Sequence, residues 1–267
     1  MMRYTPLFAA AAAITIAAPS AAQDHSVETV LAQPHRDDDR ARDQYRHPAE
    51  TLAFFGVESG MTVVEYGPGG GWYTRVLVPY IAPHGSYIAV DRDRGPVEEG
   101  TQGWGEQFSA AVTASGLAPN GNVAAFELDE IPESAVGTAD RVLIFRSLHG
   151  MIGGNRADAE LRAIRTLLAD DGMVGVVQHR ASEGAPFEYV NGSRGYLRQS
   201  DVVRLFELNG FELVDSSEIN ANPNDPSNWE RGVWTLPPTF ALGDENRDTY
   251  AAIGESDRMT LLFRKRD

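Results

Sequence analysis

A glycine-rich turn with the sequence VVEYGPGGGW is the strongest chemical signal in this chain. Gly67, Gly69 and Gly71 let the backbone turn tightly and approach a ligand without Cβ clashes, and they expose amide groups at the start of a helix. Two acids sharpen the signal: Glu65 lies two residues before the first glycine, and Asp91 ends the next expected strand. The pattern predicts a site for a small polar ligand.

Asp91 indicates that this ligand carries a ribose. A carboxylate at the end of a second strand can accept hydrogen bonds from both ribose hydroxyls, although a turn or helix-cap role is the alternative. A nicotinamide dinucleotide site would need Gly or Ala at position 72, where this chain has Trp72. The residues therefore favour a nucleoside ligand other than a nicotinamide cofactor.

His149 is the best-placed candidate for a general base. It follows an expected strand at residues 141–145, and it could take a proton there or simply be satisfied by backbone in a loop. Arg146 in the same segment is a candidate for binding an anion. His179 and Arg180 follow the next expected strand, and they either line the same pocket or are structural.

Alternating strands and helices are expected to bring these residues to one edge of a sheet. Apolar runs predict strands at residues 61–66, 87–90, 123–128, 141–145, 173–178, 211–216 and 259–264. Amphipathic segments predict helices at residues 48–55, 72–81, 107–115, 157–168 and 200–209. This alternation predicts an α/β fold, a Rossmann-like, seven-stranded and mostly parallel sheet with helices on both faces. The ligand should lie at the carboxyl ends of the strands, near the point where the strand order reverses.

Two further segments flank this pattern. Residues 35–46 contain four Asp and four Arg and are interpreted as a solvated charged helix within an N-terminal helical arm, residues 23–56. An insert rich in Pro, Asn and acids, residues 220–256, is too long for a simple connection and is predicted to form an ordered lid. Trp229 and Trp234 in this insert either anchor it to the core or contact a ligand.

The first 22 residues are predicted to be a signal peptide. Arg3 is followed by an apolar stretch over residues 7–18 and by small residues that favour cleavage before Gln23. The apolar stretch is too short to span a membrane, and no second one follows. We therefore expect a periplasmic or secreted mature chain, residues 23–267, that forms a single domain; its oligomeric state stays open.

Charge and cysteine content narrow the partners. A formal net charge of -15 repels phosphate backbones and anionic lipid, so a small molecule is the expected partner and neither nucleic acid nor a membrane is expected. The chain has no cysteine, which excludes disulfides and thiolate metal sites. The six histidines show no ligand spacing, and no metal is expected.

The glycine turn also carries a family resemblance. The run EYGPGGG resembles the E/D-x-G-x-G-x-G first motif of class I S-adenosylmethionine (SAM)-dependent methyltransferases. The run LLADDGM, residues 167–173, is similar to their L-x-P-G-G turn before the fifth strand, with two Asp in place of Pro-Gly. Asp43 with the run RHPAE, the run GPGGGWYT, and SDRM at residues 256–259 resemble a group of predicted exported bacterial methyltransferases. The resemblance covers nearly the whole mature chain and implies the fold and SAM, but no acceptor.

The resemblance implies roles for individual positions. The three glycines of the turn would pack against the methionine part of SAM, and Glu65 would hold its amino group directly or through water. Asp91 would take the ribose hydroxyls, and either Asp129 or Glu127 would face the adenine. Arg146 would bind the SAM carboxylate or an anionic acceptor.

A SAM-dependent methyltransferase acting on a small or exported acceptor is the resulting expectation, with His149 as candidate base. The alternative is a SAM- or nucleoside-binding protein that kept the fold and lost the reaction. This alternative is considered because SAM is made in the cytoplasm and the signal peptide would export the chain away from it. A nicotinamide oxidoreductase is disfavoured by Trp72 and by the missing Tyr-x-x-x-Lys pattern, since the only lysine is Lys265.

Overall fold

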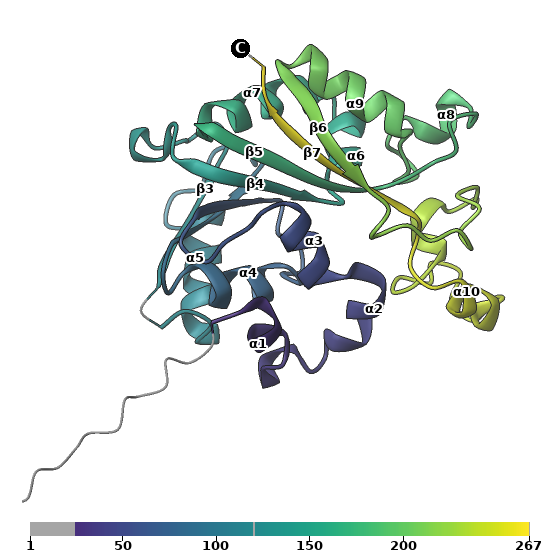
Figure 1. The fold of residues 1–267 in the computed structure, drawn as a ribbon, viewed down its shortest axis with the longest axis horizontal. Coiled ribbons are helices and arrows are strands. Elements are labelled where there is room, and N and C mark those ends of the chain that lie inside the picture. Colours follow the sequence, from purple (N-terminus) through teal and green to yellow (C-terminus); the bar gives the residue numbers. More distant parts are fainter. Residues whose placement is uncertain (1–24, 120, 267) are drawn as a thin grey trace, which may run out of the picture.

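A seven-stranded sheet forms the centre of the computed structural model, which describes residues 25–119 and 121–266 (Figure 1). The predicted signal peptide lies outside the described residues. The strands are β1 Thr62–Tyr66, β2 Ser86–Asp91, β3 Asn122–Glu127, β4 Ala139–Phe145, β5 Leu168–His179, β6 Phe211–Ser217 and β7 Arg258–Lys265. Their order is β3-β2-β1-β4-β5-β7-β6; β1 to β5 are parallel, and β7 is antiparallel to β5 and β6. This confirms the predicted mostly parallel, Rossmann-like sheet.

Short helices connect and flank these strands. The α-helices are α1 Val27–Leu31, α2 Asp43–Arg46, α3 Pro48–Phe54, α4 Thr74–Ile81, α5 Trp104–Ser115, α6 Leu148–Gly153, α7 Ala157–Leu167, α8 Phe187–Val190, α9 Gln199–Leu208 and α10 Arg247–Ile253. The 3₁₀ turns are η1 Pro34–Arg36, η2 Arg40–Arg42, η3 Glu133–Ala135 and η4 Gly232–Thr235. Within the described residues every helix is too short or too polar to span a bilayer.

Helices cover both faces of the sheet, as Figure 1 shows. Successive side chains of a strand point to opposite faces, so Val63 packs into one apolar cluster with α1, α3, α4 and α5, whereas Val64 packs into another with α6, α7 and α9. Both valines are fully buried. Burial on both sides explains why the central strands are continuous apolar runs rather than alternating ones.

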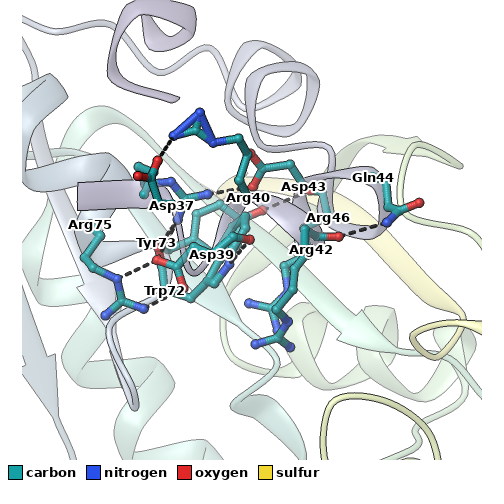
Figure 2. Close-up of polar contacts among 12 residues, drawn as sticks. Asp37, Asp39, Arg40, Arg42, Asp43, Gln44, Arg46, Trp72, Tyr73 and Arg75 are labelled. Carbon is teal, nitrogen blue, oxygen red and sulfur yellow. Dashed lines mark hydrogen bonds and ion pairs between the residues drawn. The ribbon is translucent and has the colours of Figure 1, made fainter. Parts of the chain in front are cut away.

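The charged arm is the first place where the sequence interpretation was wrong. Residues 35–46 do not form one solvated helix; they form η1, η2 and α2, and the Arg36 side chain is fully buried. Its guanidinium lies 4.4 Å from the centre of the Trp72 ring and donates to Asp39 at 2.9 Å and to Asp43 at 2.6 Å. Asp39 in turn accepts two hydrogen bonds from Arg75, shown in Figure 2. The charges are therefore paired within the protein around an aromatic ring.

The segment before β5 also differs from its prediction. A turn like L-x-P-G-G was expected at residues 167–173, but β5 already begins at Leu168. The pairing with β4 shifts from Ala139 opposite Leu168 to Arg141 opposite Met173, so the extra residues of β5 form an irregularity within the strand. Asp170, where the family has Pro, is exposed in this irregularity. An Asp, unlike Pro, keeps the backbone N–H that a strand can use.

Candidate functional site

Three cavities lie in a row along the edge of the sheet where the parallel strands end. The first cavity, about 520 Å³, lies at the ends of β2 and β3, and the middle cavity, about 290 Å³, lies at the ends of β1 and β4. The third cavity, about 440 Å³, lies beyond β4 and β5, where the antiparallel β7 begins. The row follows the strand order, and the middle cavity lies where that order reverses, the usual ligand position in open α/β sheets.

The glycine turn forms one wall of the middle cavity. Gly67, Gly69 and Gly71 have φ angles of 60°, 55° and 74°, which a side chain would strain. A Cβ on Gly67 would come within 2.9 Å of Ser147 Oγ, so the turn also approaches the chain after β4 closely. Gly67 and Gly69 line the cavity itself, and Gly71 closes the turn behind them with a hydrogen bond to Pro68.

Glu65 lies at the floor of the middle cavity. Its side chain is buried, and Oε2 accepts hydrogen bonds from Tyr87 at 2.6 Å and Thr74 at 2.8 Å. Burial raises the pKa of Glu65 to about 7 against the opposing effect of these two bonds. Among the described residues no donor reaches Oε1. That oxygen is thus available to accept a hydrogen bond from a cationic ligand group.

Arg146 lies between the middle and third cavities and lines both. It leaves β4 with a left-handed backbone, φ 58°, and its N–H donates to Val177 O at 2.7 Å. No residue that the structure describes forms a hydrogen bond or ion pair with its guanidinium. Burial lowers the pKa of Arg146 to about 10, the Arg258 charge acts in the same direction, and Glu255 opposes both. The group still carries its proton at neutral pH.

The first cavity brings together the acids predicted to bind a nucleoside. Asp91 pairs in register with Glu127 across β2 and β3; Glu127 is buried and accepts the Arg94 N–H at 2.6 Å. Glu127 and the exposed Asp129 both line the cavity. Asp91 lies beside it and forms an ion pair with the half-exposed Arg94. Both alternatives for the adenine-facing acid therefore lie at the same cavity.

Asp93 was not foreseen from the sequence. Its carboxylate lies with those of Glu127 and Asp129, and one oxygen of each is within 4.8 Å of the others. In the sequence, the only indication for Asp93 was that it lies two residues after Asp91, at the end of the second strand. The three converging acids make this cavity locally negative.

His149 and His179 line the third cavity, with their ring centres 5.9 Å apart. Burial lowers the pKa of His149 below its ordinary value of 6.5, although a contact from Gln178 opposes this; burial lowers that of His179 further, helped by the Arg258 charge. Both rings are therefore neutral at pH 7 and can accept a proton. His179 Nδ1 lies 2.6 Å from Ser256 Oγ.

Arg180 and Trp229 hold the structure together away from this cavity. Arg180 forms ion pairs with Asp257 and Glu218 and is not among the residues that line the third cavity. Trp229 donates its indole N–H to an Asp225 oxygen at 2.9 Å, whereas Trp234 lines the third cavity with its ring 5.9 Å from that of His149. Of the two tryptophans in the insert, one anchors it and the other faces the cavity.

The arm and β7 supply cavity residues that the chemical search of the sequence missed. Arg42, Arg46 and Arg258 surround Glu255, which is only 2% exposed. The Arg46 guanidinium lies 4.5 Å from the centre of the Trp72 ring. The resemblance had singled out the runs around Arg46 and Arg258. Because they are 212 positions apart, nothing in the sequence indicated that they meet.

Comparison with solved structures identifies the architecture. A SAM-dependent methyltransferase from Aquifex aeolicus is 20% identical, with a TM-score of 0.52 over 73% of this chain and 93% of that protein. The chain has a class I methyltransferase fold. A 1,6-didemethyltoxoflavin-N1-methyltransferase from Burkholderia thailandensis, with bound 1,6-didemethyltoxoflavin and S-adenosylhomocysteine, is 17% identical, with a TM-score of 0.50 over 94% of each chain.

Another protein with this methyltransferase fold is the [4+2]-cyclase SpnF, which is 16% identical, with a TM-score of 0.52 over 83% of this chain and 80% of that protein. Neither a family model nor a curated protein sequence matches the chain. At these identities the likeness establishes the fold, and function must be argued from the cavities.

Proposed function

We propose that this protein is a SAM-dependent methyltransferase acting on a small-molecule acceptor. The carrying observation is the middle cavity, where a turn of left-handed glycines faces a buried acid with one unpaired oxygen at the point where the strand order reverses. These features fit the methionine end of SAM: Glu65 Oε1 would accept from the ammonium group, and the glycines would allow close approach of the chain. Bound SAM supplies an electrophilic methyl group on a sulfonium.

The neighbouring cavities fit the rest of the reaction. Asp91 would hold the ribose hydroxyls, and Asp129 or Glu127 the adenine, so that the nucleoside occupies the first cavity. The third cavity, which shares Arg146 with the middle cavity and contains the neutral His149, would then receive the acceptor. His149 would accept the proton that the acceptor loses when it takes the methyl group from bound SAM. Alignment of donor and acceptor in adjacent cavities would supply the rest of the rate enhancement.

The chain is further proposed to act outside the cytoplasm, on the evidence of its N-terminal sequence. An exported chain would be separated from the cytoplasm, where SAM is made. A SAM- or nucleoside-binding protein without the methyl-transfer reaction is therefore the alternative function. Protein that binds S-adenosylhomocysteine (SAH) but transfers no labelled methyl group to any small-molecule extract would favour that alternative.

Calorimetric titration with SAH tests the donor site. Because Glu65 ionises near neutral pH, SAH affinity should rise as the pH increases from about 6 to about 7.5, and Glu65→Gln should lose this rise. The ionisation of the ligand is the same for both proteins, so the ratio of their affinities isolates Glu65. Absence of SAH binding to the wild type, or binding of NAD instead, would overturn the proposal.

A further inference from the structure

The lining of the third cavity has a charge opposite to that of the protein. Four guanidinium groups, those of Arg42, Arg46, Arg146 and Arg258, face one carboxylate, Glu255. Because both cavity histidines are neutral, these five groups give the lining a net charge of +3. The whole chain, in contrast, has a formal net charge of -15. Such a concentration of one sign in a cavity attracts ligands of the other sign.

These cations are incompletely paired. Glu255 accepts from Arg42 Nε at 2.6 Å and Arg46 Nε at 3.1 Å, and it also contacts Arg258. Arg46 Nη1 and Arg258 Nε are buried and find no hydrogen-bond partner in the described part of the chain. Burial also lowers the pKa of Arg46 to about 8, with the Arg146 charge acting in the same direction. A buried guanidinium N–H without an acceptor is destabilising, and a bound anion could accept from such groups and relieve that penalty.

Arg146 is the group best placed to bind such an anion. Its guanidinium has no ion-pair partner among residues 25–119 and 121–266, and it lines the cavity beside His149. An arginine presents a planar fork of donors that matches a carboxylate or phosphate in a bidentate arrangement. Val233, Trp234 and Pro237 also line this cavity and give it an apolar part. The cavity thus offers an anion site and an apolar surface together.

We infer that the methyl acceptor is a small organic molecule with an apolar body, a carboxylate or phosphate-ester group held by Arg146 and the arginines around Glu255, and a separate group whose proton His149 would accept. This rests on the proposed function and specifies its substrate class. The cavity of about 440 Å³ lies within the usual size range for small-molecule sites. The anion would bind at the guanidinium groups, and the apolar body would contact Trp234.

Matched pairs of ligands test the inference by calorimetry. Benzoate and benzamide have nearly the same size and differ in charge. Phenyl phosphate and phenol share the phenyl ring and oxygen and differ by the anionic phosphate group. Each is titrated into full-length mature protein with and without saturating SAH, so that loss of SAH binding cannot mask the comparison. We expect at least one anion to bind about ten-fold or more tightly than its neutral partner, and the stronger of the two identifies carboxylate or phosphate as the preferred group.

Variants assign that preference to Arg146. Arg146→Gln should abolish the preference and Arg146→Lys should keep part of it; both side chains have an unbranched Cβ like that of Arg, so the left-handed backbone is not strained further. Arg204→Gln is the control, because it removes the same charge from an exposed position on α9. Equal binding of anions and neutral partners by the wild type would overturn the inference, as would a preference that survives in Arg146→Gln. Absence of SAH binding alone would instead contradict the proposed function.

Discussion

Glu255 should be one of the most important residues for stability, since it joins the arm to the start of β7. Its carboxylate is 2% exposed and contacts Arg42, Arg46 and Arg258. Burial alone would raise its pKa, but the charges of Arg258, Arg46 and Arg42 lower the pKa to about 2, from an ordinary value of 4.5. At about 1.4 kcal/mol for each pKa unit, the ionised carboxylate contributes about 3 kcal/mol to the free energy of unfolding.

Glu255→Gln should therefore lower the free energy of unfolding by about 3 kcal/mol at neutral pH, because Gln has the shape of the protonated acid and leaves three cations without their anion. The folded-state pKa is depressed, so the stabilisation is complete above about pH 4.5 and is lost as the pH falls toward about 2. The difference between wild type and variant should thus decrease to about 2 kcal/mol at about pH 3.5.

Urea unfolding followed by circular dichroism measures both values. Glu245→Gln is the matched control, because Glu245 is exposed in the same insert and its replacement should change stability by less than about 0.5 kcal/mol. A loss below about 1 kcal/mol for Glu255→Gln at neutral pH would contradict the argument, and so would a difference that stays constant as the pH is lowered.

The proposed reaction leads to three further predictions. Asp91→Asn should weaken SAH binding by about 2 kcal/mol in calorimetry, whereas Arg94→Gln, which removes the ion-pair partner of Asp91 and the Arg94 contact with the Trp104 ring but keeps the Asp91 carboxylate, should not weaken it. His149→Ala should lower turnover by about 10²–10⁴-fold with little change in SAH affinity. Turnover of the wild type at saturating SAM should fall with decreasing pH only below the ordinary histidine pKa of 6.5, since the neutral ring is the base; equal losses of affinity and turnover would contradict this role. Mass spectrometry of native protein should find a chain starting at or near Gln23, and an intact Met1 would contradict export.

Much of the fold was predictable because the central strands are buried on both faces. Apolar runs such as residues 141–145 have few alternatives to a buried strand, and the observed β4, Ala139–Phe145, differs from the prediction by two residues at one end. The tight turn at Gly67, Gly69 and Gly71 was predictable for a related reason, since left-handed backbone after a strand restricts the residue types locally. These features depend on short stretches of sequence. The roles of these glycines and of Glu65 in binding a ligand stay predictions.

The features that could not be predicted depend on contacts between distant segments. The arm reads as a solvated helix because charge patterns describe only local neighbours, whereas its Arg36 is buried by Trp72 and Asp43. The cationic third cavity is likewise assembled from the arm, the end of β4 and the start of β7. Whether a charged residue lies in solvent or in a cavity is decided by these tertiary contacts, which spacing in the sequence does not reveal.

Trp72 connects these two kinds of feature. In the sequence it occupies the position where a nicotinamide fingerprint needs a small residue, so it argued against that cofactor. In the structure its indole N–H donates to Asp39 O at 3.4 Å, and its ring contacts the guanidinium groups of both Arg36, at 4.4 Å, and Arg46, at 4.5 Å. The residue that ends the glycine turn therefore positions the arm that supplies arginines to the third cavity. Trp72 also lines the middle cavity, so the proposed donor site and the arm that supplies arginines to the proposed acceptor site both contact this one side chain.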